Sequence, residues 1–455
     1  MSIETVPETD SRYYLINFDR RGAERADDPD APNGRLTDTV ADVLTTRPIT
    51  DVFFMSHGWQ GDVPAAKRQY DAWTRAMLDC SADIERIRNT RRGFAPLLIG
   101  LHWPSLPWGN EDQDARQQAY SLGQSTSAAD TATDPRTEWI DQAAECLADT
   151  PRARDALRTL FDSAMDDIAP DALPDEVLDA YEILLEESRL AAEGPAGAPG
   201  NDMDGFDPEA IYEQALDGTL DFPAGALAGA LLSPLRALSF WHMKARARRF
   251  GEGGAADLLR RLQGIAAGRD VRFHLMGHSL GCIVVSAAVN GTADGAALIK
   301  PVDSLFLVQG ALSLWAYCRE VPGTPGQPGY FHPLVADAKV AGPIVTTRSR
   351  HDTAVRLVYA VSAGLAGQQD YAPGQDQLPR YGGIGMFGIQ GPGIAIEQRP
   401  MLPADGDYDF LGARVYNLDA NDVITQGGGL AGAHNDFTKP PVAHAFWQAI
   451  AACGD

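Results

Sequence analysis

The chain has 455 residues, which is enough for one large domain with insertions or for two smaller domains. Apolar residues make up 44% and charged residues 22%, proportions that are ordinary for a globular protein with a sizeable core. The formal net charge of -24 would repel nucleic acid and anionic lipid, so we expect neither nucleic acid nor a membrane surface as a partner.

Cysteine usage and the opening residues favour a cytoplasmic location. The 5 cysteines are widely spaced and form no CxxC pair, so neither a disulfide framework nor a zinc site is predicted. The opening sequence MSIETVPETD is acidic and lacks the apolar stretch of a signal peptide. The most apolar stretch, residues 222–241, is interrupted by Pro234 and Arg236, so it does not predict a membrane span.

Short apolar runs alternate with helical patterns over the first hundred residues, which is typical of α/β architecture. Strands are predicted at 13–18, 51–56 and 96–103, and a helix at 65–78. The strand pattern then stops at Pro104. From about 105 to 245 the sequence has helical patterns joined by polar loops, and we interpret this region as a helical insertion.

The strand pattern resumes in the last third of the chain. Further strands are predicted at 271–276, 304–308, 343–347 and 413–418, and helices at 255–267, 282–289 and 441–452. Residues 1–104 and 246–455 are therefore expected to form the two parts of one core, with a mostly parallel central sheet flanked by helices.

The strand at 271–276 leads into Gly277-His278-Ser279-Leu280-Gly281, which fits the G-x-S-x-G pattern of a serine on a sharp strand-to-helix turn. Such a turn holds the serine in a strained backbone conformation. Side chains two residues before and after the serine would collide, so glycine is expected at both places. The alternative is a chance glycine-rich turn, but the strand before it and the small-residue helix after it favour Ser279 as a nucleophile.

A serine hydroxyl needs a base, and histidine is the usual one. Of the histidines after Ser279, His434 lies in a glycine-rich loop between the last strand and the last helix, from which an imidazole can reach the sheet edge. His444 falls inside the closing helix and His332 follows a turn, so both are predicted to be structural. His351 comes too early in the chain. His434 is therefore the candidate base.

The base needs a carboxylate to orient it, and Asp352 follows the penultimate strand after a short turn. Its alternative role is the N-cap of a helix that starts directly after it. Asp419 and Asp422, after the last strand, are reserve candidates. The preceding strand ends at Gln309 with no carboxylate, which disfavours an acid at that place.

Stabilisation of an oxyanion needs two backbone N–H groups. One is expected from Leu280, directly after the candidate nucleophile. The other is expected from Trp59 in the loop after the strand at 51–56, with Gln60 as the less favoured choice. The alternative is that Trp59 simply packs at the end of that strand.

In this order, the residues His57-Gly58-Trp59, Gly277 to Gly281, Asp352 and His434 resemble the α/β-hydrolase superfamily. The sequence Trp103-Pro104-Ser105 is also similar to a feature of lipase-like bacterial hydrolases. The resemblance implies an α/β-hydrolase fold and a lipase-like or carboxylesterase-like serine hydrolase without a metal or organic cofactor. We expect the insertion at 105–245 to form a cap.

The expected reaction is hydrolysis of a small-molecule carboxylic ester or other acyl substrate through an acyl-enzyme formed on Ser279. An acyltransferase, thioesterase or amidase with the same triad remains an alternative, as does a catalytically silent binding module. The presence of serine, aspartate and histidine together disfavours the silent module. The GxGxxG pattern at 383–388 lies in a glycine-rich and proline-rich loop, so dinucleotide binding is not predicted.

Overall fold

The computed structural model describes residues 2–59, 63–105, 135–167, 169–190, 195, 197–202, 205–216, 230–291, 295–355, 359, 378–427 and 432–453. The chain divides into two compact units. The first comprises residues 1–105, 246–356 and 382–455, and the second comprises residues 106–245 and 357–381. All five candidate site residues belong to the first unit.

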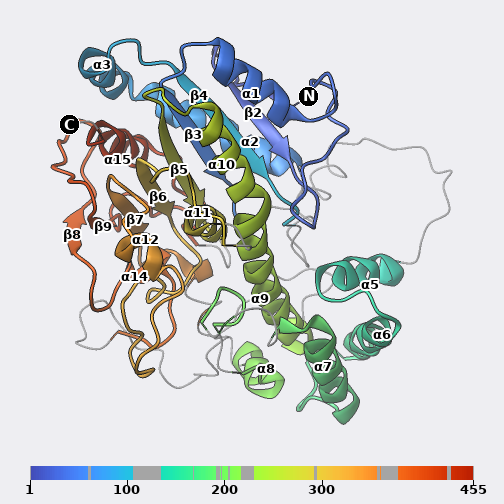
Figure 1. The fold of residues 1–455 in the computed structure, drawn as a ribbon. Coiled ribbons are helices and arrows are strands. Elements are labelled where there is room, and N and C mark those ends of the chain that lie inside the picture. The colour runs from blue at the N-terminus through green and yellow to red at the C-terminus, as the bar shows by residue number, and fades with distance from the viewer. Residues whose placement is uncertain are drawn as a thin grey trace. The chain divides into compact units, whose positions relative to one another are not determined.

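The first unit contains a 9-stranded sheet with the order β1-β2-β4-β3-β5-β6-β7-β9-β8 (Figure 1). Strand β1 runs antiparallel to β2, and the other neighbouring pairs are parallel. The predicted α/β class with a mostly parallel sheet is therefore confirmed. The strands are β1 (Ile3–Thr5), β2 (Arg12–Asn17), β3 (Asp51–Ser56), β4 (Pro96–His102), β5 (Arg272–His278), β6 (Ser304–Val308), β7 (Ile344–Arg348), β8 (Ile396–Pro400) and β9 (Val415–Asp419).

Helices cover both faces of this sheet (Figure 1). Helices α2, α3 and α15 pack together on one face, and α1, α10 and α11 pack on the other. Every residue of β3 and β6 is buried, as expected for parallel strands between two helical layers. The helices of this unit are α1 (Leu36–Thr46), α2 (Val63–Asp79), α3 (Ser81–Thr90), α10 (Ala256–Ile265), α11 (Gly281–Asn290), α12 (His332–Ala336), α14 (Ile384–Phe387) and α15 (Pro440–Ala451), and a π-helical turn spans Gly251–Ala255.

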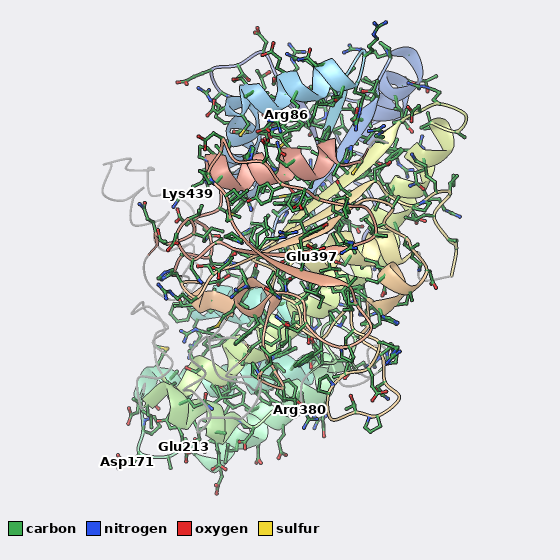
Figure 2. All side chains as sticks on the ribbon, turned by 90° about the vertical axis from the view of Figure 1, so that its left-hand side faces the viewer. Arg86, Asp171, Glu213, Arg380, Glu397 and Lys439 are labelled. Carbon is green, nitrogen blue, oxygen red and sulfur yellow. The ribbon has the colours of Figure 1, made fainter. Side chains whose placement is uncertain are left out.

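The edge strand β8 was not predicted from the sequence, because its residues are mostly polar and only partly buried. Its residue Glu397 forms ion pairs with Arg399 and Arg414 (2.7 and 2.6 Å), and Figure 2 shows Glu397 on this edge. Charged side chains on an edge strand discourage pairing with another chain. The strand therefore carries the composition of a protected edge instead of an apolar pattern.

The second unit is helical, with α5 (Pro135–Cys146), α6 (Pro151–Asp166), α7 (Asp175–Ser188), α8 (Pro208–Leu216), a 3₁₀ turn at Ala230–Leu232 and the first part of α9 (Ser233–Phe250). Residues 357–381 also belong to this unit, whereas the sequence placed them in the core. Tyr359, from this segment, is joined to the rest of the unit by Lys244. The Lys244 side chain is fully buried and donates to Asp202 (2.5 Å) and to Tyr359 (3.0 Å). Burial lowers the pKa of Lys244 to about 8, although the charge of Asp202 opposes that shift.

The apolar stretch at 222–241 was not expected to span a membrane. Its residues 222–229 lie outside the described part of the chain. Among the helices that the structure describes, none combines the length and the apolar character that crossing a bilayer requires.

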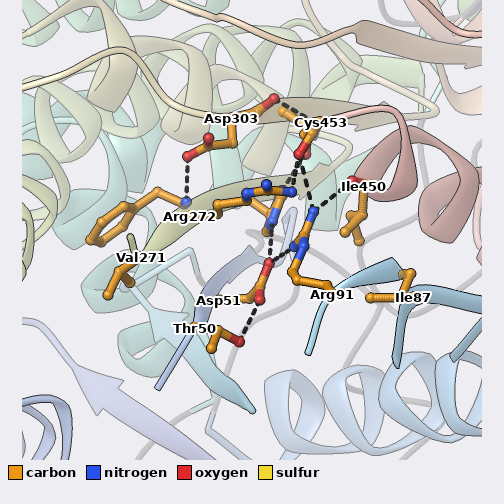
Figure 3. A network of polar contacts seen from close by, with 12 residues as sticks. Thr50, Asp51, Ile87, Arg91, Val271, Arg272, Asp303, Ile450 and Cys453 are labelled. Carbon is orange, nitrogen blue, oxygen red and sulfur yellow. Dashed lines mark hydrogen bonds and ion pairs between the residues drawn. The ribbon is translucent and has the colours of Figure 1, made fainter. Parts of the chain in front are cut away.

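A buried polar network lies at the beginning of strand β3 (Figure 3). The carboxylate of Asp51 is completely buried, accepts a hydrogen bond from Thr50 (2.7 Å) and forms an ion pair with Arg91. Arg91 also donates to the main-chain oxygen of Cys453 (3.0 Å), which accepts a second hydrogen bond from Arg272. The network thereby attaches the segment after α15 to the sheet.

Replacement of Arg91, whose side chain is 15% exposed, is expected to lower stability strongly. Arg91→Met should lower the free energy of unfolding by about 3–5 kcal/mol, because it leaves the Asp51 carboxylate buried without its cation. The control is Arg86→Met, since Arg86 (Figure 2) and its partner Asp407 have side chains that are 50% and 75% exposed. That variant should lose less than about 1 kcal/mol. Urea unfolding of both variants measures the difference, and equal losses would contradict the prediction.

Candidate functional site

Ser279 lies on a sharp turn between β5 and α11. Its backbone φ is 56°, in the left-handed region that residues other than glycine seldom adopt. Its main chain is held from two sides, since its N–H donates to Val308 O (3.1 Å) and its carbonyl accepts from Ala311 N (3.1 Å). The strained turn is thus fixed by the last residue of β6 and by the segment that follows it.

The glycines around Ser279 are required by close packing. A Cβ atom at Gly277 would lie 2.4 Å from the Gly281 oxygen, and one at Gly281 would lie 2.2 Å from the Ser56 oxygen. The predicted steric need for glycine at both places is therefore confirmed. Gly58 has the same constraint, because a Cβ there would lie 2.5 Å from Ser279 Cβ. The loop after β3 and the candidate nucleophile are in direct contact.

Asp352 and His434 form a buried pair at the carboxyl end of the sheet. His434 Nδ1 donates to Asp352 Oδ2 at 2.9 Å. The carboxylate is completely buried and the histidine is 8% exposed. This contact fixes the imidazole tautomer with the proton on Nδ1, which leaves Nε2 as the atom that can accept a proton.

Asp352 also meets the alternative expectation from the sequence. Its Oδ1 accepts from Val355 N (3.0 Å), as an N-cap does for the helical residues that begin at Thr353. Its Oδ2 accepts from Gln309 Nε2 (2.8 Å) in addition to His434. Oδ1 therefore caps the helical residues, and Oδ2 orients the imidazole of His434.

His278, inside the G-x-S-x-G pattern, connects the candidate base to helix α2. Its Nδ1 accepts from Gln69 Nε2 (2.8 Å), and its Nε2 donates to the main-chain oxygen of His434 (3.0 Å). Its ring stacks on Phe437 with centroids 4.2 Å apart. Burial, together with repulsion from His434, places the pKa of His278 well below its ordinary value, so the ring is neutral and this direction of donation is kept.

The peptide bond before Trp59 is also fixed. The Gly58 carbonyl accepts from His57 Nδ1 (2.8 Å) and from Ser105 Oγ (3.0 Å). Because a trans peptide directs its C=O and N–H to opposite sides, these two contacts set the direction of the Trp59 N–H. Burial lowers the pKa of His57 to about 3, with a smaller contribution from His102, so the donor is a neutral imidazole. Gln60, the less favoured choice, lies outside the described residues.

The N–H of Leu280 is at the beginning of α11, next to Ser279. The first N–H groups of a helix have no acceptor within the helix, and the helix dipole favours negative charge at this end. Leu280 has φ and ψ of −63° and −22°, and α11 continues from Gly281 to Asn290. An oxyanion formed beside Ser279 would therefore meet the positive end of α11.

One expected contact is not made. In the described part of the chain, no hydrogen bond joins Ser279 Oγ to the imidazole of His434. The two residues are neighbours through His278, whose ring centroid is 4.9 Å from that of His434. In proteins without bound substrate, hydrogen bonds between a nucleophile and its base are often long and shorten when substrate binds.

The other candidates have different partners. Asp419 pairs with Arg348 (2.8 Å), and Asp422 is exposed. His332 Nδ1 contacts Tyr317 O (3.0 Å), and His444 Nδ1 donates to Asp83 (2.7 Å). His351 accepts from Arg350 at 3.4 Å. None of these contacts involves Ser279, Asp352 or His434.

A second series of serine, histidine and aspartate lies toward the amino ends of the central strands β3, β5 and β6. Ser304 Oγ donates to His274 Nδ1 (2.9 Å), and His274 Nε2 donates to Asp51 (3.1 Å). All three residues are completely buried. Because no substrate can reach them without unfolding, the Ser279 arrangement is the better candidate for chemistry.

The Ser279 arrangement can support nucleophilic chemistry by a hydroxyl group. A serine on a strained turn, a histidine of fixed tautomer and backbone N–H groups at a helix start are the parts that acyl transfer requires. Gln309 and Gly58 were not assigned roles from the sequence, since neither has a reactive group of the expected kind. His278 was not assigned one either, because a single sequence does not show what its ring contacts. Comparison of the chain with models of protein families, with curated proteins and with solved structures finds no match.

Proposed function

We propose that the chain is a serine hydrolase of the α/β-hydrolase fold that cleaves carboxylic esters. The observation that carries the proposal is the position of Ser279. It lies on a left-handed turn between β5 and α11, beside a buried pair of Asp352 and His434. Strand order, the glycine contacts of the turn and the order of serine, aspartate and histidine along the chain support it.

In the proposed reaction, His434 Nε2 takes the Ser279 hydroxyl proton while Oγ forms a bond to the carbonyl carbon of the ester. The carbonyl oxygen becomes negative and accepts hydrogen bonds from the N–H groups of Leu280 and Trp59. Collapse of this intermediate breaks the ester C–O bond, and the alcohol leaves with the proton from His434. Asp352 keeps the imidazole oriented and offsets its positive charge.

Water completes the cycle. His434 takes one proton from the water as its oxygen attacks the acyl carbon. The bond between the acyl carbon and Ser279 Oγ then breaks, Oγ regains the proton from His434, and the carboxylic acid is released. Acyl transfer to another acceptor and cleavage of a thioester or amide use the same residues.

The cap role of residues 105–245 stays a prediction, which rests on where the insertion leaves the sheet, after β4.

The proposal is tested with a panel of nitrophenyl esters of increasing acyl length, measured with and without an added alcohol. A hydrolase is expected to release acid at a rate that depends on acyl length, because one methylene in an apolar pocket is worth about 1–3 kcal/mol. A transferase would instead form a new ester in the presence of the alcohol. Absence of turnover on every ester of the panel would favour the silent module.

A further inference from the structure

Gln309 occupies the turn after β6, between the candidate nucleophile and the candidate acid. It is completely buried, and its φ is 46°, again in the left-handed region. Val308, directly before it, and Ala311, two residues after it, hold the main chain of Ser279. A buried glutamine in a strained conformation beside a reactive group requires a specific reason.

The side-chain amide of Gln309 has a defined orientation. Its Oε1 accepts from Thr347 Oγ1 (2.9 Å), on the neighbouring strand β7. Its Nε2 faces two acceptors, Asp352 Oδ2 (2.8 Å) and Gly385 O (3.3 Å). Since only the nitrogen can donate to both, the amide must point its N–H groups toward the carboxylate.

Asp352 is therefore held from several directions. Val355 N donates to one oxygen, and Gln309 and His434 donate to the other. Gly385 closes the remaining side, because a Cβ there would lie 2.9 Å from Asp352 Oδ2. Without the Gln309 amide, the carboxylate could rotate about its own bond and lose alignment with the imidazole.

We propose that Gln309 is a positioning residue, whose amide holds the Asp352 carboxylate in the orientation that His434 needs. This inference rests on the proposed function. Gln309 does not contact the reacting atoms, so its replacement should change turnover more than substrate affinity.

The chain contains a matched control for this arrangement. Gln448 Nε2 donates to Asp83 Oδ1 (2.7 Å), and His444 Nδ1 donates to Asp83 Oδ2 (2.7 Å). This is the same order of glutamine, aspartate and histidine, also buried, on helices α3 and α15. Removing Gln448 reports the structural consequence of losing such an amide without touching the proposed site.

The test compares Gln309→Leu with Gln448→Leu. We expect Gln309→Leu to lower kcat about 10²-fold with little change in KM, because a small misalignment of a catalytic group has an effect of that order. Gln448→Leu is expected to lower the unfolding temperature similarly and to keep the wild-type kcat. Equal kcat in both variants would overturn the inference.

Gln309→Glu supplies a second readout and carries the test if Gln309→Leu does not fold. Two adjacent buried carboxyl groups share one proton, so a protonated Glu at this place can still donate to Asp352. The ratio of variant to wild-type kcat/KM should therefore fall as pH rises and that proton is lost. His434 and His278 are the other titratable groups that contact this cluster among the described residues, and the wild-type protein measured over the same pH range is the reference.

The outcomes separate this inference from the proposed function. A wild-type protein without turnover or labelling by a serine-directed probe contradicts the proposed function, and this inference with it. An active wild type with a pH-independent ratio for Gln309→Glu, or with unchanged kcat in Gln309→Leu, contradicts the role of Gln309 alone.

Discussion

Ser279→Ala is expected to lower kcat by about 10⁴–10⁶, since it removes the atom that would form the acyl-enzyme in the proposed reaction. The fold should be retained, because alanine keeps the Cβ atom that packs against Gly58 and loses only the hydroxyl. Steady-state hydrolysis of the best ester of the panel measures the effect, and circular dichroism and the unfolding temperature establish that the variant is folded.

The chain offers a control for the chemical surroundings of this serine. Ser304 also contacts a histidine that is paired with an aspartate, but it is completely buried at the amino end of the central strand β6. Ser304→Ala should therefore leave kcat near the wild-type value, whatever its effect on stability. If Ser304→Ala is folded and loses most of its kcat, while Ser279→Ala loses little, the nucleophile is not Ser279.

Asp352→Asn is expected to lower kcat by about 10⁴, the order of loss when the orienting acid of a triad becomes an amide. The asparagine oxygen can still accept from Val355 N, so the helix cap is kept. Its nitrogen, however, would face the donors of His434 and Gln309, which favours the wrong tautomer of the imidazole. The variant thereby separates the catalytic role from the capping role.

The same experiment decides between the candidate acids. If Asp352 served only as a cap, Asp352→Asn would keep turnover, because asparagine caps helices about as well as aspartate. Asp419→Asn is the control, since Asp419 is paired with Arg348. A small loss of kcat in Asp352→Asn and a large loss in Asp419→Asn would move the acid to the end of β9.

The sequence predicted the central strands well because they are apolar and bounded by turn residues. The strand at 51–56 and the turn at 277–281 were expected at the places where the structure has them. The sequence predicted the pairing of His434 with Asp352 only from the order of the two residues along the chain. The distance of 2.9 Å between His434 Nδ1 and Asp352 Oδ2 is known only from the structure.

Other features were beyond sequence reasoning for physical reasons. The short strand β1 and the polar edge strand β8 lack an apolar run of their own. In the sequence, Gln309 showed only that this strand end has no carboxylate. A single sequence does not show that its amide faces Asp352. Gly385 belongs to the GxGxxG pattern, which was interpreted from the sequence as a loop. In the structure it lies in the short helix α14 and packs closely against Asp352.

The most direct measurement of the proposed chemistry is labelling with a fluorophosphonate probe, followed by mass spectrometry of the digested protein. The reagent reacts with an activated serine, so the probe should be found on Ser279 in the wild-type protein. Labelling should be absent in Ser279→Ala and slow in Asp352→Asn. Full labelling of Ser279→Ala, or a probe carried by another residue of the wild-type protein, would contradict Ser279 as the nucleophile.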